Sequence, residues 1–244
     1  MADDGYHAAM PTLVLLPGLH GTAHLFEPLR AHLPAEFTVR TISYPTRRLR
    51  SPRQLLQQIE AELANETEVV LLGESFSGPL ALAFAAAHPQ RVRGVILAAT
   101  FIKAPVPRLL SLLGAPFALV RFPMPGFLMR WFLAGRGASR ELVGEMQRVI
   151  NLNSPLVIAH RVGATAWIDA GAALRRCSVP VLCLAGRHDR LIGRRAVRRM
   201  RRCRPGMRVK EFDAPHLLLQ RQAEGCAREI AGFVRALETS AFVL

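Results

Sequence analysis

The chain has 244 residues, half of them hydrophobic, which is enough for one large domain with a substantial core. Its formal net charge of +14 is carried almost entirely by arginine. No zinc-finger, helix-turn-helix or RNA-binding signature accompanies this charge, so nucleic acid is not an expected partner. No uncharged apolar run reaches the roughly 18 residues that a transmembrane helix needs.

The cysteines and the first residues bear on compartment, metals and cofactors. Four cysteines show neither CxxC spacing nor a Cys/His cluster, so we expect reduced thiols and no metal. Residues 1–10 carry two aspartates and no basic segment followed by an apolar one, so no secretory signal is expected. A dinucleotide fingerprint is absent around the glycine-rich stretch at residues 73–78, and we expect no cofactor. These features predict a cytoplasmic protein.

Short apolar runs typical of strands alternate with helical stretches along most of the chain. The strand candidates are Thr12–Leu16, Phe37–Ile42, Val69–Leu72, Gly94–Ala98, Val181–Ala185 and Met207–Phe212. Helices are expected near Leu25–Leu33, Ser51–Ala64, Pro79–Ala87, Arg194–Arg202 and Leu217–Leu237. This alternation predicts an α/β fold, with a mostly parallel sheet of about six strands and helices on both faces.

The stretch from residue 103 to residue 163 carries no strand pattern. It holds apolar clusters separated by prolines, which predict several short helices. About 60 residues without a strand is far longer than a normal crossover, so we interpret the stretch as a helical lid. The core would then consist of residues 1–102 and 164–244. Ordinary helical packing within the main core is the alternative.

A serine lies between glycines at an expected strand-to-helix turn, in the sequence Gly73-Glu-Ser75-Phe-Ser-Gly78. An apolar run suited to a buried strand precedes it, and a Leu- and Ala-rich helical stretch follows it. Small residues on both sides of the serine allow the backbone to bend sharply and expose the hydroxyl. A plain glycine- and serine-rich loop is the alternative, and the context has to decide between them.

The context supplies an acid and a base. Asp189 follows the strand candidate Val181–Ala185, and His216 comes four residues after Phe212, where the last strand candidate ends. Loops at the carboxyl ends of parallel strands are where open α/β sheets place their sites. Asp213 is a rival for the acid, because it lies three residues before His216, but such a short turn rarely reaches Nδ1 correctly. His188, on the acid's own loop, is expected at the rim.

With Ser75, Asp189 and His216 in this order, the chain resembles the α/β-hydrolase family along nearly its whole length. The resemblance implies that Ser75 is the nucleophile, His216 the general base and Asp189 the group that orients the imidazole. In the family, a loop after the first core strand contributes to the oxyanion hole. Here that loop reads Pro17-Gly18-Leu19, so the implied donors are the backbone N–H groups of Leu19 and Phe76.

Three residues near the expected site depart from or add to the family pattern. Ser77 stands where the family usually has the second glycine of the elbow, which leaves the turn possible but tighter. Glu74, beside the nucleophile, either lines the pocket or makes a structural hydrogen bond. His20, next to the expected oxyanion loop, either touches substrate or has a surface or capping role.

The apolar lid favours an ester with an apolar acyl part as substrate, with His20, Phe127 and Trp131 as candidate contacts. An acyl-CoA or acyl-carrier-protein thioesterase shares the same acyl-enzyme step and stays open. So does a non-catalytic homologue that keeps the fold as a ligand-binding pocket. Small bacterial members of the family include the biotin-pathway esterases, which cleave a pimeloyl methyl ester carried by an acidic acyl carrier protein. The arginines that could receive such a partner are Arg108, Arg121, Arg130, Arg136 and Arg140.

Overall fold

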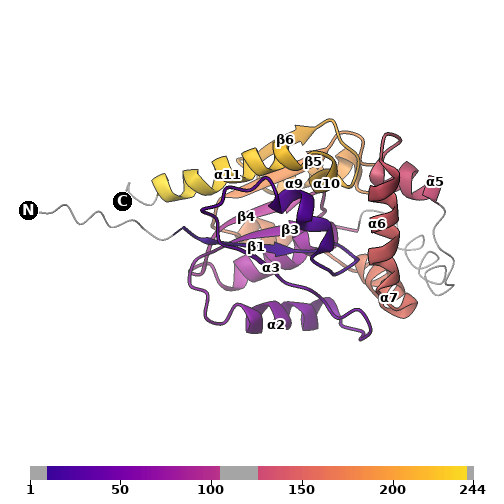
Figure 1. Ribbon diagram of the computed structural model, residues 1–244. Helices are drawn as coiled ribbons and strands as arrows, with labels where there is room; N and C mark the ends of the chain where they lie inside the picture. Colours follow the sequence, from indigo (N-terminus) through magenta and orange to yellow (C-terminus); the bar gives the residue numbers. More distant parts are fainter. Residues whose placement is uncertain (1–9, 105–125, 241–244) are drawn as a thin grey trace, which may run out of the picture.

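A six-stranded, all-parallel sheet forms the centre of the computed structural model, which describes residues 10–104 and 126–240. The strand order is β2-β1-β3-β4-β5-β6 (Figure 1). The strands are β1 Thr12–Leu16, β2 Val39–Thr41, β3 Val69–Glu74, β4 Val92–Ala98, β5 Val181–Gly186 and β6 Arg208–Phe212. The predicted α/β fold with about six mostly parallel strands is therefore confirmed.

The central strands are the most buried because they are continuous runs of Val, Leu and Ile. Every residue of β3 is buried, as parallel strands covered on both faces require. The register pairs Leu16 of β1 with Gly73 of β3, and Glu74 of β3 with Ala98 of β4. The carboxyl ends of these strands are therefore level, and the loops that follow them meet at one edge of the sheet.

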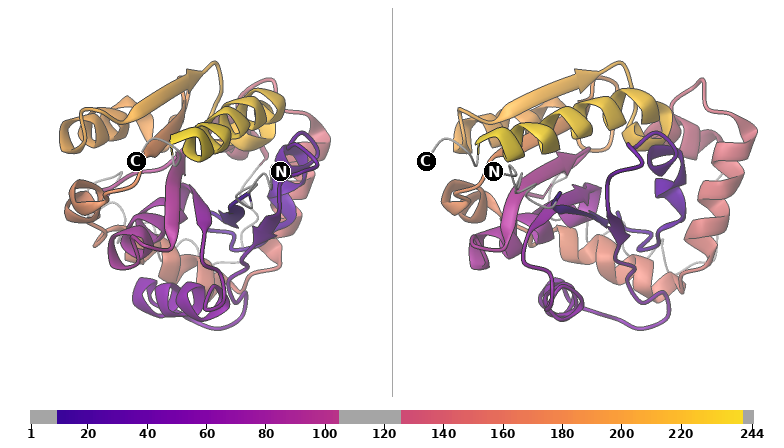
Figure 2. Two further views of the ribbon diagram at one scale, coloured as in Figure 1. Left: turned by 90° about the vertical axis from the view of Figure 1, so that its left-hand side faces the viewer. Right: turned by 60° about the vertical axis from the view of Figure 1, so that its left-hand side comes forward.

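Helices cover both faces of the sheet. Figure 2 shows α2 (purple) and α11 (yellow) on opposite sides of it. One apolar core lies under α2, α3, α8 and α9, and the other lies under α1 and α11. The α-helices are α1 Glu27–Arg30, α2 Pro52–Glu62, α3 Gly78–Ala87, α5 Gly126–Met129, α6 Arg140–Asn151, α7 Pro155–Thr165, α8 Gly171–Arg176, α9 Gly193–Cys203, α10 Leu218–Arg221 and α11 Ala223–Ser240. Other helical turns are η1 His24–Phe26, η2 Ser75–Ser77 and η3 Arg130–Ala134. None of the described helices is long and apolar enough to cross a membrane.

Between β4 and β5, the described residues form several helices and no further strand of the sheet. We call α5, η3, α6 and α7 the helical insertion; they lie together at one end of the sheet (Figure 1). A small apolar core of its own, including Met129 and Val143, packs it on Leu25 and Leu217. Residues 105–125, which include Arg108, Arg121 and about a third of the predicted lid, lie outside the described part. The boundaries 1–102, 103–163 and 164–244 stay a prediction.

Candidate active site

Ser75 lies directly after β3, on a sharp turn into α3. Its φ is 49°, in the left-handed region that residues with a side chain rarely adopt. The two flanking glycines have no room for a side chain: a Cβ on Gly73 would lie 2.7 Å from the Cα of Gly78, and one on Gly78 would overlap Thr100. The glycines therefore permit the turn, and Ser75 takes up its strained backbone conformation, as at many functional sites.

The structure brings the three predicted residues together in one chain of hydrogen bonds. Ser75 Oγ lies 3.1 Å from His216 Nε2, and His216 Nδ1 lies 2.8 Å from Asp189 Oδ2. The other oxygen of Asp189 accepts the backbone N–H groups of Leu191 and Ile192, at 2.9 and 2.8 Å. All three side chains are at least nine-tenths buried. The carboxylate is therefore fixed in place, and it in turn orients the imidazole toward the serine.

The charges around His216 favour its protonated form. Burial alone lowers the pKa of His216, but the carboxylates of Asp189 and Glu74 outweigh burial and hold that pKa above its ordinary value. A base of raised pKa accepts a proton more readily from the serine hydroxyl. The field at this site therefore suits proton transfer from Ser75 to His216.

The two rivals for the acid and base pair with each other, away from the site. Asp213 Oδ1 lies 2.5 Å from His188 Nε2, and both side chains are more than two-thirds exposed. Asp213 therefore contacts His188, and it is Asp189 whose carboxylate contacts His216. The expected rim position of His188 matches this exposure.

The loop after β1 lies against the nucleophile. A Cβ on Gly18 would be 3.6 Å from the Cβ of Ser75, so the backbone of this loop approaches the serine closely. Leu19 follows Gly18, and Phe76 follows Ser75. The two backbone N–H groups predicted as oxyanion donors therefore belong to the residues that directly follow Gly18 and Ser75 in the chain. Their role as donors stays a prediction.

Glu74 makes structural hydrogen bonds beneath this loop. One of its oxygens accepts the Gly18 N–H at 3.3 Å and lies 3.4 Å from Nε2 of His20; the other accepts from Gln220 at 3.0 Å. Burial raises the pKa of Glu74, but His20 and Gln220 outweigh it and leave that pKa below its ordinary value. His20 contacts Glu74 and Thr22, so its contact with substrate stays a prediction.

Ser77, which departs from the family pattern, also joins the turn to the loop. Its side chain is fully buried, and its hydroxyl donates to the Pro17 carbonyl and lies 2.7 Å from Oη of Tyr44. Burial raises the pKa of Tyr44, which keeps the phenol protonated as a donor to Ser77. Where the family usually has glycine, this serine therefore adds two buried hydrogen bonds.

Replacing Ser77 with glycine is expected to destabilise the protein, although it restores the usual motif. The change removes both bonds and leaves the buried Tyr44 hydroxyl without a partner, which costs about 1–3 kcal/mol. Urea unfolding measures the loss. With Tyr44→Phe also present, the loss caused by Ser77→Gly should shrink, because no phenol is then left unpaired. Equal losses in both backgrounds would contradict the account.

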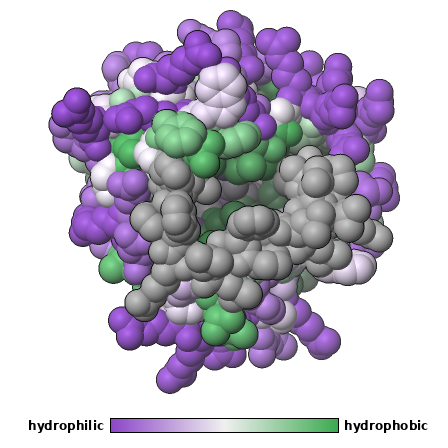
Figure 3. Space-filling model, turned by 90° about the vertical axis from the view of Figure 1, so that its right-hand side faces the viewer, coloured by the Kyte–Doolittle hydropathy of each residue, from purple (hydrophilic) through white to green (hydrophobic). Residues whose placement is uncertain are grey.

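Apolar side chains line part of a hollow at the end of the molecule that carries the helical insertion (Figure 3). Phe127 of α5 and Trp131 of η3, both predicted as substrate contacts, are exposed side chains of the helical insertion. Trp131 lies under the guanidinium of Arg190, 3.7 Å from the ring centroid, and Arg190 is adjacent to Asp189 in the chain. Trp131 therefore contacts the loop that carries Asp189. Phe127 is 68% exposed.

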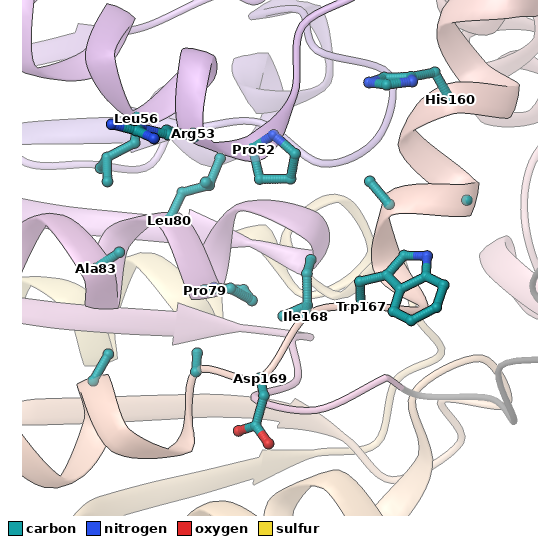
Figure 4. Close-up of a pocket in the computed structure, with 14 residues that line it drawn as sticks. Pro52, Arg53, Leu56, Pro79, Leu80, Ala83, His160, Trp167, Ile168 and Asp169 are labelled. Carbon is teal, nitrogen blue, oxygen red and sulfur yellow. The ribbon is translucent and has the colours of Figure 1, made fainter.

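A cavity of about 700 Å³ lies elsewhere, between α2, α3, the end of α7 and α8. Figure 4 shows Pro52 and Leu80 on one side of it and Trp167 on the other. Ser75, Asp189 and His216 do not line it, so it is separate from the hydrogen-bonded site. In the described residues, no group of three His, Cys, Asp or Glu side chains is arranged to hold a metal.

Known proteins are similar to this chain over most of its length. Residues 13–229 match the model of the Alpha/beta hydrolase family. Two curated relatives are pimeloyl-[acyl-carrier protein] methyl ester esterases of Neisseria meningitidis, one from a serogroup C strain and one from a serogroup A strain. Each is 25% identical to this chain, and each alignment covers 94% of it. The alignments cover 95% of the serogroup C relative and 78% of the serogroup A relative.

Solved structures share the fold at lower identity. The enol-lactonase from Burkholderia xenovorans superimposes with a TM-score of 0.83 at 19% identity, covering 94% of this chain and 93% of the other. A hydrolase from Oleispira antarctica also superimposes with a TM-score of 0.83, at 17% identity, covering 92% of this chain and 91% of the other. An esterase from Thermogutta terrifontis superimposes with a TM-score of 0.79, at 21% identity, covering 93% of this chain and 90% of the other. These likenesses establish the architecture.

Proposed function

The chain belongs to the alpha/beta hydrolase family, and on that premise we propose that it hydrolyses carboxylic esters through an acyl-enzyme on Ser75. The observation that carries the proposal is the buried chain of hydrogen bonds from Ser75 through His216 to Asp189. A side-chain hydroxyl, an imidazole and a carboxylate linked in this way form an activated nucleophile. Turnover of a p-nitrophenyl ester, with the acyl group trapped on Ser75, tests it.

In the proposed reaction, Ser75 Oγ attacks the ester carbonyl while His216 Nε2 takes the hydroxyl proton. Asp189 keeps the imidazole in the required tautomer and stabilises the imidazolium that forms. The N–H groups of Leu19 and Phe76 donate to the carbonyl oxygen as it becomes negative. His216 then returns the proton to the departing alcohol, and it activates a water molecule that releases the acid from the acyl-enzyme.

The finer proposal is that the ester belongs to an acyl group with an apolar chain, carried by an acidic acyl carrier protein. Two curated relatives carry the name of such an esterase. Phe127 and Trp131 would contact the acyl part. Arg136, Arg140 and Arg190 are exposed on or beside the helical insertion, where an acidic partner would approach. Arg130 is half-buried there.

Added salt is expected to separate the two kinds of substrate. From about 50 to about 300 mM NaCl, kcat/KM for a pimeloyl methyl ester on acyl carrier protein should fall about tenfold, because ions screen the attraction between the partners. For p-nitrophenyl butyrate it should stay constant. The double variant Arg136→Gln/Arg140→Gln should lose most of the salt dependence, whereas Arg228→Gln, a control on α11, should keep it. Equal salt dependence for both substrates would remove the case for docking through these arginines.

Two alternatives remain from the sequence. A thioesterase would show a higher kcat/KM for an acyl-CoA than for the oxygen ester of the same acyl chain. A non-catalytic ligand-binding homologue would turn over neither compound. The buried hydrogen bonds of Asp189 and His216 favour an enzyme, because a binding pocket has no need of them. The cytoplasmic location stays a prediction.

A further inference from the structure

Arg161 of α7 is an unusual buried residue. Only 2% of it is exposed, and among the described residues no carboxylate lies within ion-pair distance of its guanidinium. Burial lowers the pKa of Arg161 to about 10, so the side chain still carries its charge at neutral pH. Burying a charge without a counter-ion is costly unless its donors are well used.

The guanidinium binds one backbone carbonyl of the loop beside the nucleophile and one of the segment that follows β2. Arg161 Nη1 donates to the Leu19 carbonyl at 2.7 Å, and Nη2 donates to the Pro45 carbonyl at 2.9 Å. Gly21 makes room for it: this glycine has a φ of 70°, and a Cβ there would lie 2.5 Å from Nη1. The loop and the arginine are therefore fitted to each other.

Asn153, at the junction of α6 and α7, holds the next carbonyl. Its Nδ2 donates to the His20 carbonyl at 2.9 Å, and its Oδ1 accepts from Arg161 at 3.2 Å. Asn153 is itself more than nine-tenths buried. Two linked side chains of the helical insertion therefore bind the carbonyls of two successive loop residues.

The other end of the loop is held by the core. Ser77 donates to the Pro17 carbonyl, Glu74 accepts the Gly18 N–H, and the Gly18 carbonyl accepts the Gly21 N–H at 3.0 Å. The peptide that contains the Leu19 N–H is therefore fixed through its own carbonyl, that of Gly18. The peptide after it is fixed through the Leu19 carbonyl, by Arg161. Because the peptide groups on both sides of Leu19 are held by hydrogen bonds, the Leu19 N–H has a defined direction.

We propose that Arg161 is a positioning residue of the oxyanion hole, which sets the Leu19 N–H toward the carbonyl under attack. The inference rests on the proposed ester hydrolysis. Arg161 acts through Leu19 and reaches the site only when α7 is packed on the core, so the helical insertion completes the catalytic centre. Its positive charge also favours the negative oxygen of the tetrahedral intermediate.

The test compares Arg161→Met, which keeps the length of the side chain, with Val157→Ala, a control that truncates another buried side chain of α7 but retains the guanidinium and its hydrogen bonds. Val157 is buried on the same helix. For p-nitrophenyl butyrate, Arg161→Met should lower kcat by about 10²- to 10³-fold with little change in KM. Inhibition by a trifluoromethyl ketone, which forms a tetrahedral oxyanion on Ser75, should weaken by the same factor. Val157→Ala should lower Tm and leave both constants within about threefold.

The proposal is overturned if folded Arg161→Met binds the trifluoromethyl ketone as tightly as the wild type. It is also overturned if Val157→Ala loses kcat and inhibitor affinity to the same extent, since Arg161 would then be only structural. Should Arg161→Met fail to fold, Arg161→Lys and Asn153→Ala are tested in the same way, with expected losses of about tenfold. A wild-type protein without ester turnover would overturn the proposed function as well, whereas an active wild type with an unaffected Arg161→Met overturns this inference alone.

Discussion

Replacing Ser75 with alanine is expected to lower kcat for p-nitrophenyl butyrate by about 10⁴- to 10⁶-fold and to abolish labelling by a fluorophosphonate probe. The loss is large because the hydroxyl is the only group of the site that can form the acyl-enzyme in the proposed reaction. His216 would still be present at its place, 3.1 Å from the missing oxygen, but without a nucleophile to deprotonate. Since the two groups act as a unit, His216→Ala should cost about as much.

Mass spectrometry of the intact protein and of its peptides locates the fluorophosphonate adduct. The matched control is Ser178→Ala, because Ser178 is an exposed serine on the loop before β5. This control should keep both labelling and turnover. An adduct on a serine other than Ser75, or a wild-type protein that is not labelled at all, would contradict the proposed nucleophile.

Most of the fold could be predicted from the sequence, because its signals are local. The runs at Val69–Leu72 and Val181–Ala185 are short and apolar, and the structure extends them only to Glu74 and Gly186. The edges of the sheet were harder to delimit. The first edge strand, expected at Phe37–Ile42, covers only Val39–Thr41, the residues that lie in register with Leu13–Leu15 of β1.

In the candidate site, only the residues that belong to a recognisable sequence motif could be predicted. Ser75, Asp189 and His216 each follow a strand, in an order shared with a known family. Arg161 gives no such signal, since it is one of many arginines and lies 142 residues from the Leu19 carbonyl that it holds.

The structural role of Ser77 could not be predicted from the sequence either. Its hydrogen-bond partners, Tyr44 and Pro17, lie 33 and 60 residues away in the chain. From the motif alone, the serine appears only as a substitute for glycine. Contacts of this kind exist only once the sheet has brought distant loops to one edge.

Replacing Asp189 with asparagine is expected to lower kcat by about 10⁴-fold, although the two side chains have nearly the same shape. Asp189 Oδ2 accepts the Nδ1 proton of His216 at 2.8 Å, which leaves Nε2 free to take the serine proton. An asparagine held in this place can present its amide N–H to Nδ1. The imidazole then carries its proton on Nε2, facing Ser75, and no longer serves as a base.

The pH profile of Asp189→Asn tests the same contact independently. Activity requires neutral His216, so kcat/KM falls as the pH drops through the pKa of that residue. In the wild type the carboxylate of Asp189 helps to raise this pKa, and its loss should move the acid limb of the residual activity to lower pH. Asp213→Asn, whose carboxylate contacts His188, is the matched control and should change neither kcat nor the profile. A silent Asp189→Asn beside an inactive Asp213→Asn would reverse the assignment of the acid, because the carboxylate that governs His216 would then be the one on the exposed loop.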